Sequence, residues 1–290
     1  MKIDLHIHSK DCSDGRMTMP EIFEEAHKRK IEWISTTDHD SIDCQETASL
    51  LAKQYGMHYI SGVELNISFS HPRYLDSRPV SLDVLGYQFD IHNRALAQKL
   101  IESRKHRTIR AERILEKINE ELLKEDQKLF THKDLEEIEN SVDGSFGRPH
   151  IADHMIRKGL VSNRQEAFNR YLVKCNVPKM PLSLEEASGL IRGAGGKLML
   201  AHPNNRKGTS LVSLTSSLKE QFQIIRESML EYIDGVECWH SAHDPETVIA
   251  YVQFARQEGL MMTGGSDCHQ QPVIMGTIGV PDFVVRQFRL

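Results

Sequence analysis

The sequence lacks a long apolar run, an excess of basic residues and a paired-cysteine motif. Its apolar stretches fall short of the roughly 18 residues that cross a bilayer, and the segment MKIDLHIH enters a predicted strand without the apolar core of a signal peptide. Lys and Arg total 36 against 41 Asp and Glu, which argues against non-specific nucleic-acid binding by the whole chain. We therefore expect a soluble, cytoplasmic protein with no membrane association and no obligate protein partner.

The five cysteines are odd in number, widely scattered and never arranged as C-x-x-C. This pattern argues against a disulfide framework and against a zinc knuckle, and it fits a reducing compartment. Cys12 and Cys268 fall inside polar motifs, beside the residues that could bind a metal. We predict that both are packing residues.

The order of strand-like and helix-like patterns divides the chain into an outer and an inserted part. The two patterns alternate over residues 1–92 and again over 196–290, which is typical of βαβ units around a parallel sheet or barrel. Residues 93–195 have mostly helical apolar spacing. We predict an α/β barrel domain formed by 1–92 and 196–290, with a helical subdomain inserted over 93–195.

Two helix starts can be placed from capping residues. Thr18 and Glu21 form a capping box at the start of a helix predicted over 20–30. Ser41 is predicted to cap a second helix, which ends at Gly56.

Ionisable side chains follow nearly every predicted strand. His6 and His8 are two apart on the first strand, so both imidazoles point the same way and can reach one point. The ends of strands are where α/β barrels keep their chemistry. The later strands end in carboxylates and imidazoles at Asp38, His39, Asp40, Glu64, Asp83, His202, Glu237, His240, Asp267 and His269.

This set of side chains predicts a metal centre. Imidazole and carboxylate without thiolate suit manganese, iron, zinc or magnesium, and the set exceeds what one ion needs. We therefore expect two or three divalent ions. Clustered divalent metals suit the hydrolysis of phosphate esters, with a metal-bound hydroxide as the nucleophile that attacks phosphorus.

Five motifs carry a resemblance to a known family. In chain order they are DLHIHSKDCSDG, TTDHD, GVE, AHP and GSDCH. They resemble the ligand motifs of the PHP (polymerase and histidinol phosphatase) family, and the resemblance runs over nearly the whole chain. It implies a distorted (β/α)7 barrel with a trinuclear centre, manganese favoured, that hydrolyses phosphoester bonds.

The resemblance also implies three ligand sets, carried over residue by residue. Many relatives have His where this chain has Asp83, in DVLGY, so the second ion meets an anionic ligand here. His202 is a candidate both for that ion and for substrate phosphate. The sets are His6, His8, Glu64 and Asp267 for one ion; Glu64 as a bridge with Asp83 and His202 for the second; and Asp14, His39 and His269 for the third.

Two further segments, SFGRPHIADHMIRKGLVSN and WHSAHDPE, resemble the branch of the family that acts on nucleotides. That branch contains phosphatases that release the 3′-phosphate of nucleoside 3′,5′-bisphosphates, some of which trim RNA from its 5′ end, and the insertion covers the active site. The implied substrate is a small nucleotide or a 5′-phosphorylated oligoribonucleotide. Arg148, whose guanidinium can hold a phosphate bidentately, His150, His240 and His243 are the candidate catalytic residues, and Arg148, His150 and His202 the candidate substrate contacts.

Three alternatives stay open. Histidinol-phosphate phosphatase, or another small phosphomonoesterase, would share the metal motifs. Amidohydrolases also open with an H-x-H strand, but they commonly use a modified lysine as the bridge, where this chain offers Glu64. A non-catalytic metal-binding PHP accessory module is the third alternative, against which the near-complete ligand set speaks.

Overall fold

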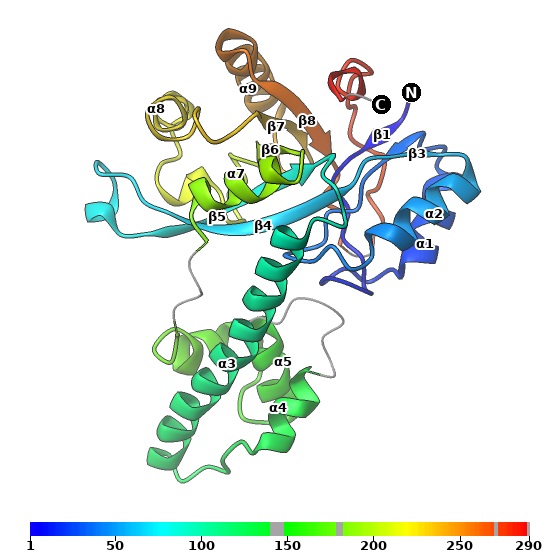
Figure 1. The fold of residues 1–290 in the computed structure, drawn as a ribbon. Helices are drawn as coiled ribbons and strands as arrows, with labels where there is room; N and C mark the ends of the chain where they lie inside the picture. The colour runs from blue at the N-terminus through cyan, green and yellow to red at the C-terminus, as the bar shows by residue number, and fades with distance from the viewer. Residues whose placement is uncertain (140–147, 178–181, 270–271, 289–290) are drawn as a thin grey trace. The chain divides into compact units, whose positions relative to one another are not determined.

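The computed structural model divides the chain into two compact units (Figure 1), Met1–Gln98 with Pro181–Leu290, and Lys99–Met180. No helix in the described ranges is long and apolar enough to cross a bilayer. The described residues are 1–139, 148–177, 182–269 and 272–288.

The first unit is built on a three-stranded and a five-stranded sheet, in the orders β1-β2-β3 and β4-β5-β6-β7-β8. β5 pairs antiparallel with both β4 and β6, and the other pairs are parallel. Helices connect the parallel strands, as the alternating sequence pattern predicts. The strands are β1 (Ile3–Asp4), β2 (Trp33–Ile34), β3 (His58–Tyr59), β4 (Gly62–Phe69), β5 (Val80–Tyr87), β6 (Lys197–Leu200), β7 (Gly235–His240) and β8 (Met261–Gly265).

Backbone hydrogen bonds join the two sheets at two places. Leu5 N donates to Gly264 O at 3.2 Å, and a parallel bridge pairs Ile7 with Cys268. A second bridge pairs His39 with Glu64. The segments that follow β1 and β2 therefore lie against β8 and β4, which confirms a mixed α/β fold.

The described part of the first unit contains five helices besides the start of α3. The capping box of Thr18 and Glu21 is present at the start of α1, whose buried residues, Met19, Ile22 and Phe23 among them, recur at helical spacing. α1 and α2 pack side by side (Figure 1). The helices are α1 (Met19–Lys28), α2 (Gln45–Tyr55), α7 (Leu184–Gly193), α8 (Leu218–Ser228) and α9 (Pro245–Glu258), with 3-10 turns at Leu75–Ser77, Leu211–Ser213 and Val285–Gln287.

The predicted start of α2 is wrong. The helix begins at Gln45 with Cys44 as its N-cap, whereas Ser41 lies in the turn before it, where its Oγ accepts from Asp43 N at 3.4 Å. Because Ser41 caps this turn, it is not available to the helix. The end is as predicted, since Gly56 adopts the left-handed conformation with φ 69°.

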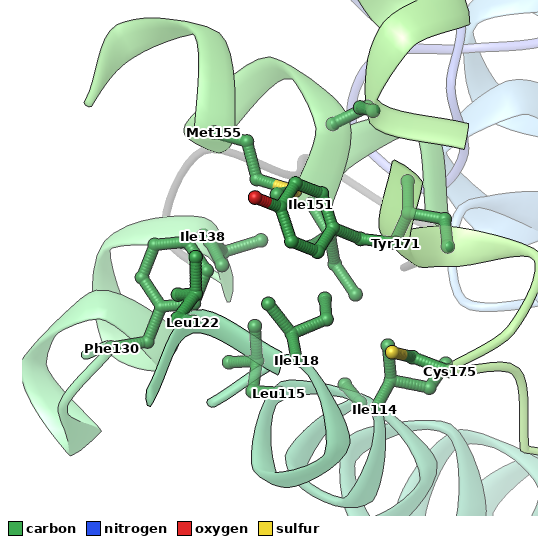
Figure 2. Close-up of a cluster of buried hydrophobic side chains, with 14 of the residues drawn as sticks. Ile114, Leu115, Ile118, Leu122, Phe130, Ile138, Ile151, Met155, Tyr171 and Cys175 are labelled. Atoms are coloured by element: carbon green, nitrogen blue, oxygen red, sulfur yellow. The ribbon is translucent and has the colours of Figure 1, made fainter. Parts of the chain in front are cut away.

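The second unit is helical and has its own core (Figure 2). Ile114, Ile118 and Leu122 on one helix pack in a cluster with Ile151 and Tyr171 from later segments. Each such buried side chain contributes roughly 1.5–3 kcal/mol. The helices are α3 (Arg94–Lys124), which begins in the first unit, α4 (His132–Glu139), α5 (Arg148–Arg157), α6 (Arg164–Ala167) and a π-helical turn, η2 (Phe168–Leu172).

The predicted insertion, 93–195, is longer at both ends than the second unit, Lys99–Met180. α7 falls inside the predicted range 93–195 but packs against β4 and β6 of the first unit. That the insertion covers the active site stays a prediction.

Candidate metal centre

Four predicted ligands converge at the ends of β1 and β8 and on β4. His6 and His8 direct their Nε2 atoms at one oxygen of Glu64, at 3.4 and 3.2 Å. The same two atoms lie 3.4 and 3.3 Å from Asp267 Oδ1. Both imidazoles and Glu64 are buried. These are the residues that the resemblance assigns to the first ion.

Glu64 lies at the middle of the cluster and uses its two oxygens on different neighbours. Its Oε2 is 3.1 Å from His39 Nδ1, while its Oε1 is 3.0 Å from His202 Nε2. Burial alone would raise the pKa of Glu64, but the imidazoles of His39 and His6 hold it well below its ordinary value. An ionised carboxylate whose oxygens face two groups of imidazoles is suited to bridging two cations.

A third group forms around Asp14, in the loop after β1. Asp14 Oδ1 lies 3.2 Å from His269 Nε2 and 3.9 Å from His39 Nε2. The ring of His8 stacks on that of His269 with centroids 3.9 Å apart, so this corner adjoins the first. It contains the residues that the resemblance assigns to the third ion.

The second nitrogen of two imidazoles is held by an acceptor. His6 Nδ1 lies 2.9 Å from Glu237 Oε1, and His269 Nδ1 lies 3.0 Å from the carbonyl oxygen of Asp267. Since both partners accept, the ring that has lost one proton keeps the other on Nδ1, and its Nε2 lone pair then faces the centre. The tautomers are therefore those that a metal ligand needs.

Glu237 was not among the predicted site residues. It is fully buried, and its other oxygen accepts from the backbone N of His202 at 2.8 Å. It therefore orients one ligand through the ring and another through the main chain. Its position at a strand end was the signal in the sequence.

The donor set fits divalent cations. Asp267 Oδ1 is buried and has no hydrogen-bond donor among the described residues, yet it lies 3.2 to 3.4 Å from ring nitrogens of His6, His8 and His269. His6 Nε2 and His8 Nε2 face each other at 3.1 Å. A cation can accept lone pairs from Asp267 Oδ1 and from the Nε2 atoms of His6 and His8, and oxygen with imidazole but no thiolate suits manganese, iron, zinc or magnesium.

Metal uptake should release protons. Although burial opposes it, the Glu64 carboxylate raises the pKa of His202 to about 9, and Asp14 and Asp267 raise the pKa of His269 to about 11. A ligand must lose its proton to bind a metal, so we expect Mn²⁺ affinity to increase as pH rises from 6 to 9. Calorimetric titrations in buffers of different ionisation enthalpy measure the released protons. A pH-independent affinity without proton release would contradict this prediction.

Two candidate ligands have an uncommon backbone conformation. His202 and Asp267 have φ of 25° and 56°, in the region that non-glycine residues rarely adopt. Such conformations cluster at functional sites, where neighbouring contacts hold them.

Asp83 is placed differently from the other predicted ligands. It lies on β5 opposite Asn66, whose Nδ2 donates to Asp83 Oδ1 at 2.6 Å. Glu64 on β4 is opposite Leu85 on β5. Asp83 therefore lies two residues away, along β5, from the position opposite Glu64. Its role as a ligand of the second ion stays a prediction.

The predicted substrate contacts divide between the two units. Arg148 and His150 lie in the second unit, where Arg148 Nη1 donates to Leu172 O at 3.2 Å and the guanidinium lies 5.4 Å from the ring centre of Phe168.

His240 belongs to the metal centre, since its Nε2 lies 3.2 Å from Asp267 Oδ2. His243 bonds elsewhere, with Nδ1 2.9 Å from Cys238 O. Burial lowers the pKa of His243 to about 4, so this ring is neutral at neutral pH. The geometry therefore favours His240 over His243 as a group that acts at the centre.

A pocket of about 370 Å³ lies beside His240. Its walls come from the end of β7, the start of α9 and the segment around Ile278, and they are mainly apolar. Trp239, Val248 and Ile249 contribute to them. Because His240 both lines the pocket and contacts Asp267, the pocket adjoins the metal centre.

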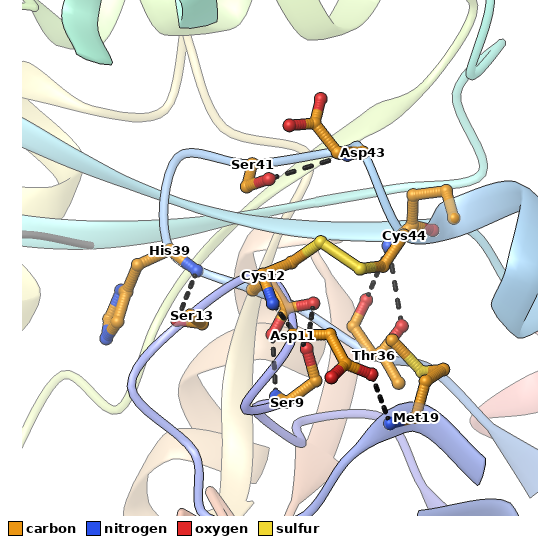
Figure 3. The surroundings of a disulfide bond; sticks show 12 residues. Ser9, Asp11, Cys12, Ser13, Met19, Thr36, His39, Ser41, Asp43 and Cys44 are labelled. Atoms are coloured by element: carbon orange, nitrogen blue, oxygen red, sulfur yellow. Dashed lines mark hydrogen bonds between the residues drawn. A yellow bond between two sulfur atoms is a disulfide. The ribbon is translucent and has the colours of Figure 1, made fainter. Parts of the chain in front are cut away.

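The expectation of free cysteines is wrong for one pair. Cys12 and Cys44 form a disulfide with a Cα–Cα distance of 6.2 Å (Figure 3). The pairing of β1 with β2 brings the loops that follow these strands together, although the two cysteines are 32 positions apart. Cys268 is free, buried and part of an apolar cluster, as predicted.

Comparison with known proteins assigns the family. The PHP domain matches residues 4–176. A 3′,5′-nucleoside bisphosphate phosphatase of Chromobacterium violaceum is 26% identical over 280 residues, which cover 92% of this chain and 87% of that protein. A 5′-3′ exoribonuclease of Haemophilus influenzae is 30% identical over 210 residues, or 70% of this chain and 69% of that protein.

Two solved structures are similar over nearly the whole chain. A protein from Bifidobacterium adolescentis described as a metal-dependent phosphoesterase has a TM-score of 0.74 at 26% identity, covering 98% of this chain and 94% of its own. An amidohydrolase from Chromobacterium violaceum, with bound sulfate and no metal, has a TM-score of 0.74 at 25% identity, covering 99% and 95%. The family match spans more than half of the sequence, so the chain belongs to the PHP domain family.

Proposed function

We propose that this protein is a metal-dependent phosphohydrolase that releases the 3′-phosphate from nucleoside 3′,5′-bisphosphates and also trims short RNA from its 5′ end. The observation that carries the proposal is the position of Glu64, whose two oxygens face imidazoles on different sides. The names of the relatives support a phosphatase and exoribonuclease activity.

The three ligand groups are proposed to hold two or three divalent ions, with manganese favoured. Bound cations would supply an activated water and neutralise charge on the phosphoryl oxygens. The chain's own groups fix this arrangement: Glu237 holds the His6 tautomer, and Asp267 O holds that of His269. Asp83 and His202 are proposed to complete the second ion's site.

His240 is the proposed proton donor to the leaving oxygen. Its Nδ1 accepts from Ala242 N at 3.0 Å, so in the neutral ring the proton is on Nε2, which faces Asp267. His243 is the weaker candidate, because its Nδ1 bonds to Cys238 O and not to a group of the metal centre. The wider scaffold is proposed to be a distorted (β/α)7 barrel, which the backbone bridges between the two sheets support.

Arg148 and His150 are proposed substrate contacts because their segment resembles the branch of the family that acts on nucleotides. We expect Arg148→Lys to raise KM for adenosine 3′,5′-bisphosphate about tenfold, because an ammonium cannot bind a phosphate bidentately. Steady-state kinetics with Arg157→Lys, a change on the same helix, as the control measure the effect. Equal KM values in the two variants would contradict a contact with phosphate.

The pocket beside His240 is proposed to accept the nucleobase. Ile249 is 58% exposed on α9 and lines this pocket, so Ile249→Asp should fold while placing a charge against the base. We expect KM for the nucleotide to rise about tenfold, since an apolar subsite contributes ~1–3 kcal/mol of binding free energy. Hydrolysis of p-nitrophenyl phosphate, which has no nucleobase, should stay unchanged. Leu50→Asp, at a 64% exposed position on α2, is the control. An equal loss on both substrates would contradict a base-binding role.

Phosphate release tests the function itself. The full-length chain with Mn²⁺ should release phosphate from adenosine 3′,5′-bisphosphate with a higher kcat/KM than from histidinol phosphate, and EDTA should stop the reaction. Shortening of a 5′-phosphorylated oligoribonucleotide tests the second activity. Absence of turnover with Mn²⁺, Fe²⁺, Zn²⁺ and Mg²⁺ would reject the proposal, and a preference for histidinol phosphate would favour the alternative phosphatase.

The similar structure named an amidohydrolase keeps C–N bond hydrolysis as a rival. Among the residues that the structure describes as buried and charged, none is a lysine. The bridging position is held by Glu64 instead. This observation favours the phosphoesterase over an amidohydrolase that depends on a modified lysine.

A further inference from the structure

We propose that the Cys12–Cys44 disulfide is a redox-exchange site that clamps the Asp14 and His39 corner of the metal centre, and that a dithiol reductant opens it. The bond joins the loop after β1 to the N-cap of α2 (Figure 3). This inference rests on the metal centre of the proposed function and not on its substrate.

The disulfide lies within the two loops that carry this corner. Cys12 is two residues before Asp14, and Cys44 is five residues after His39. Asp14 Oδ1 lies within 3.9 Å of His39 Nε2, so the two loops must keep their relative position for both side chains to serve one ion. A covalent link between the loops restricts that position directly.

Hydrogen bonds connect the same two loops beside the disulfide. The buried Asp38 accepts from Ser9 N at 2.6 Å and from Ser9 Oγ at 2.8 Å. Cys12 N in turn donates to Ser9 Oγ at 3.2 Å, and His39 N donates to Ser13 Oγ at 3.0 Å (Figure 3). These bonds can hold the loops near their places after reduction, so opening should loosen the corner rather than unfold the unit.

The pair is less deeply buried than the other cysteines. Cys12 and Cys44 are half-buried, whereas Cys175, Cys238 and Cys268 are buried. Thiol–disulfide exchange needs access for an attacking thiolate. Partial exposure of the two residues, together with proximity to two candidate ligands, favours an exchangeable bond over a purely structural one.

The exchange is balanced with a dithiol as the co-reactant. Its thiolate attacks one sulfur of the pair, and the other cysteine leaves as a thiolate and takes up a proton. The second thiol of the reductant then closes the reductant's own disulfide and releases the attacked cysteine. One S–S bond breaks and one forms, and two electrons and two protons pass to the protein.

Counting thiols tests whether the bond is present and reversible. Full-length protein prepared without reductant should show three reactive thiols per chain after denaturation, matching the free cysteines. Treatment of the native protein with dithiothreitol should raise the number to the five cysteines of the sequence. Five thiols before treatment, or three after it, would overturn the proposal.

Metal titration tests the clamp. Metal-free protein, oxidised or reduced and freed of dithiothreitol under argon, is titrated with Mn²⁺ by calorimetry. We expect reduction to weaken the binding of one of the ions by a factor on the order of ten, the lower range for loss of a supporting contact around a metal. The same affinity in both forms would overturn the proposal.

Two variants make the result specific. The double variant Cys12→Ser/Cys44→Ser should have the Mn²⁺ affinity of the reduced protein, with or without dithiothreitol treatment. The Mn²⁺ affinity of Cys175→Ser should change on reduction as it does in the unchanged chain. If the double variant does not fold, as circular dichroism shows, the titration of the unchanged chain still decides. If Mn²⁺ affinity depends on the redox state but the protein does not turn over nucleotides, the proposed function is rejected and the redox clamp stands. If the protein turns over nucleotides but its Mn²⁺ affinity is the same in both redox states, the redox clamp is rejected and the proposed function stands.

Discussion

Glu64→Gln is expected to lower nucleotide phosphatase activity by at least about 10³-fold, equivalent to ~4 kcal/mol of transition-state stabilisation. Glutamine keeps the shape of the side chain but replaces one acceptor oxygen by an amide N–H₂ and removes the negative charge. Glu64 uses one oxygen towards His6, His8 and His39 and the other towards His202, so one change affects both groups of imidazoles.

The same variant should lose metal. Elemental analysis after Mn²⁺ loading and desalting should find at least one ion fewer per chain than in the unchanged protein. Glu24→Gln is the control, because Glu24 is exposed on α1, where it pairs with Lys28 at the surface. Full activity, or full metal content with the usual Mn²⁺ affinity, would show that Glu64 is not the bridging ligand.

The convergence of the ligands was predictable because it follows from strand geometry. His6 and His8 share a face since side chains alternate along an extended segment. β8 contacts β1 and is separated from β6 by β7 alone, so His202 and Asp267, which follow β6 and β8, reach the same place although they are 65 positions apart. The alternation of side chains along a strand and the position of residues at strand ends can be read from the sequence without knowledge of side-chain packing.

The shared face of Glu237 and His240 was not predictable by the same rule. Residues three apart on a regular strand point to opposite faces, yet Glu237 contacts His6 and His240 contacts Asp267. A bulge in the pairing of β7 with β8, between Glu237 and Trp239, shifts the alternation by one residue. Nothing in the segment GVECWH marks that bulge.

The disulfide was missed for a different reason. Cysteine spacing predicts bonds only in disulfide-rich frameworks or short motifs, and this chain has neither. Cys12 and Cys44 meet because β1 and β2 are neighbours in register, with Ile3 opposite Trp33, so the loops after them run side by side. That contact is a property of the tertiary structure and not of local sequence.

Glu237→Gln should weaken Mn²⁺ binding by about 10- to 100-fold, the range for losing a hydrogen-bond partner of a metal ligand. Glu237 accepts from His6 Nδ1 through one oxygen and from His202 N through the other. Glutamine has one acceptor oxygen, so one of the two donors must face an N–H₂ group. If that donor is His6, its proton moves to Nε2 and the lone pair no longer faces the centre.

Two measurements separate this positioning role from general destabilisation. Nitrogen NMR of the histidine rings should show His6 protonated at Nδ1 in the unchanged protein and a mixture of tautomers in Glu237→Gln. Calorimetry should show the weaker Mn²⁺ binding, while Glu231→Gln, at an exposed position, changes neither result. Since a buried carboxylate beside an imidazole also contributes to folding, the melting temperature is recorded for each variant. A lower melting temperature with an unchanged His6 tautomer and unchanged Mn²⁺ affinity would assign Glu237 to stability alone.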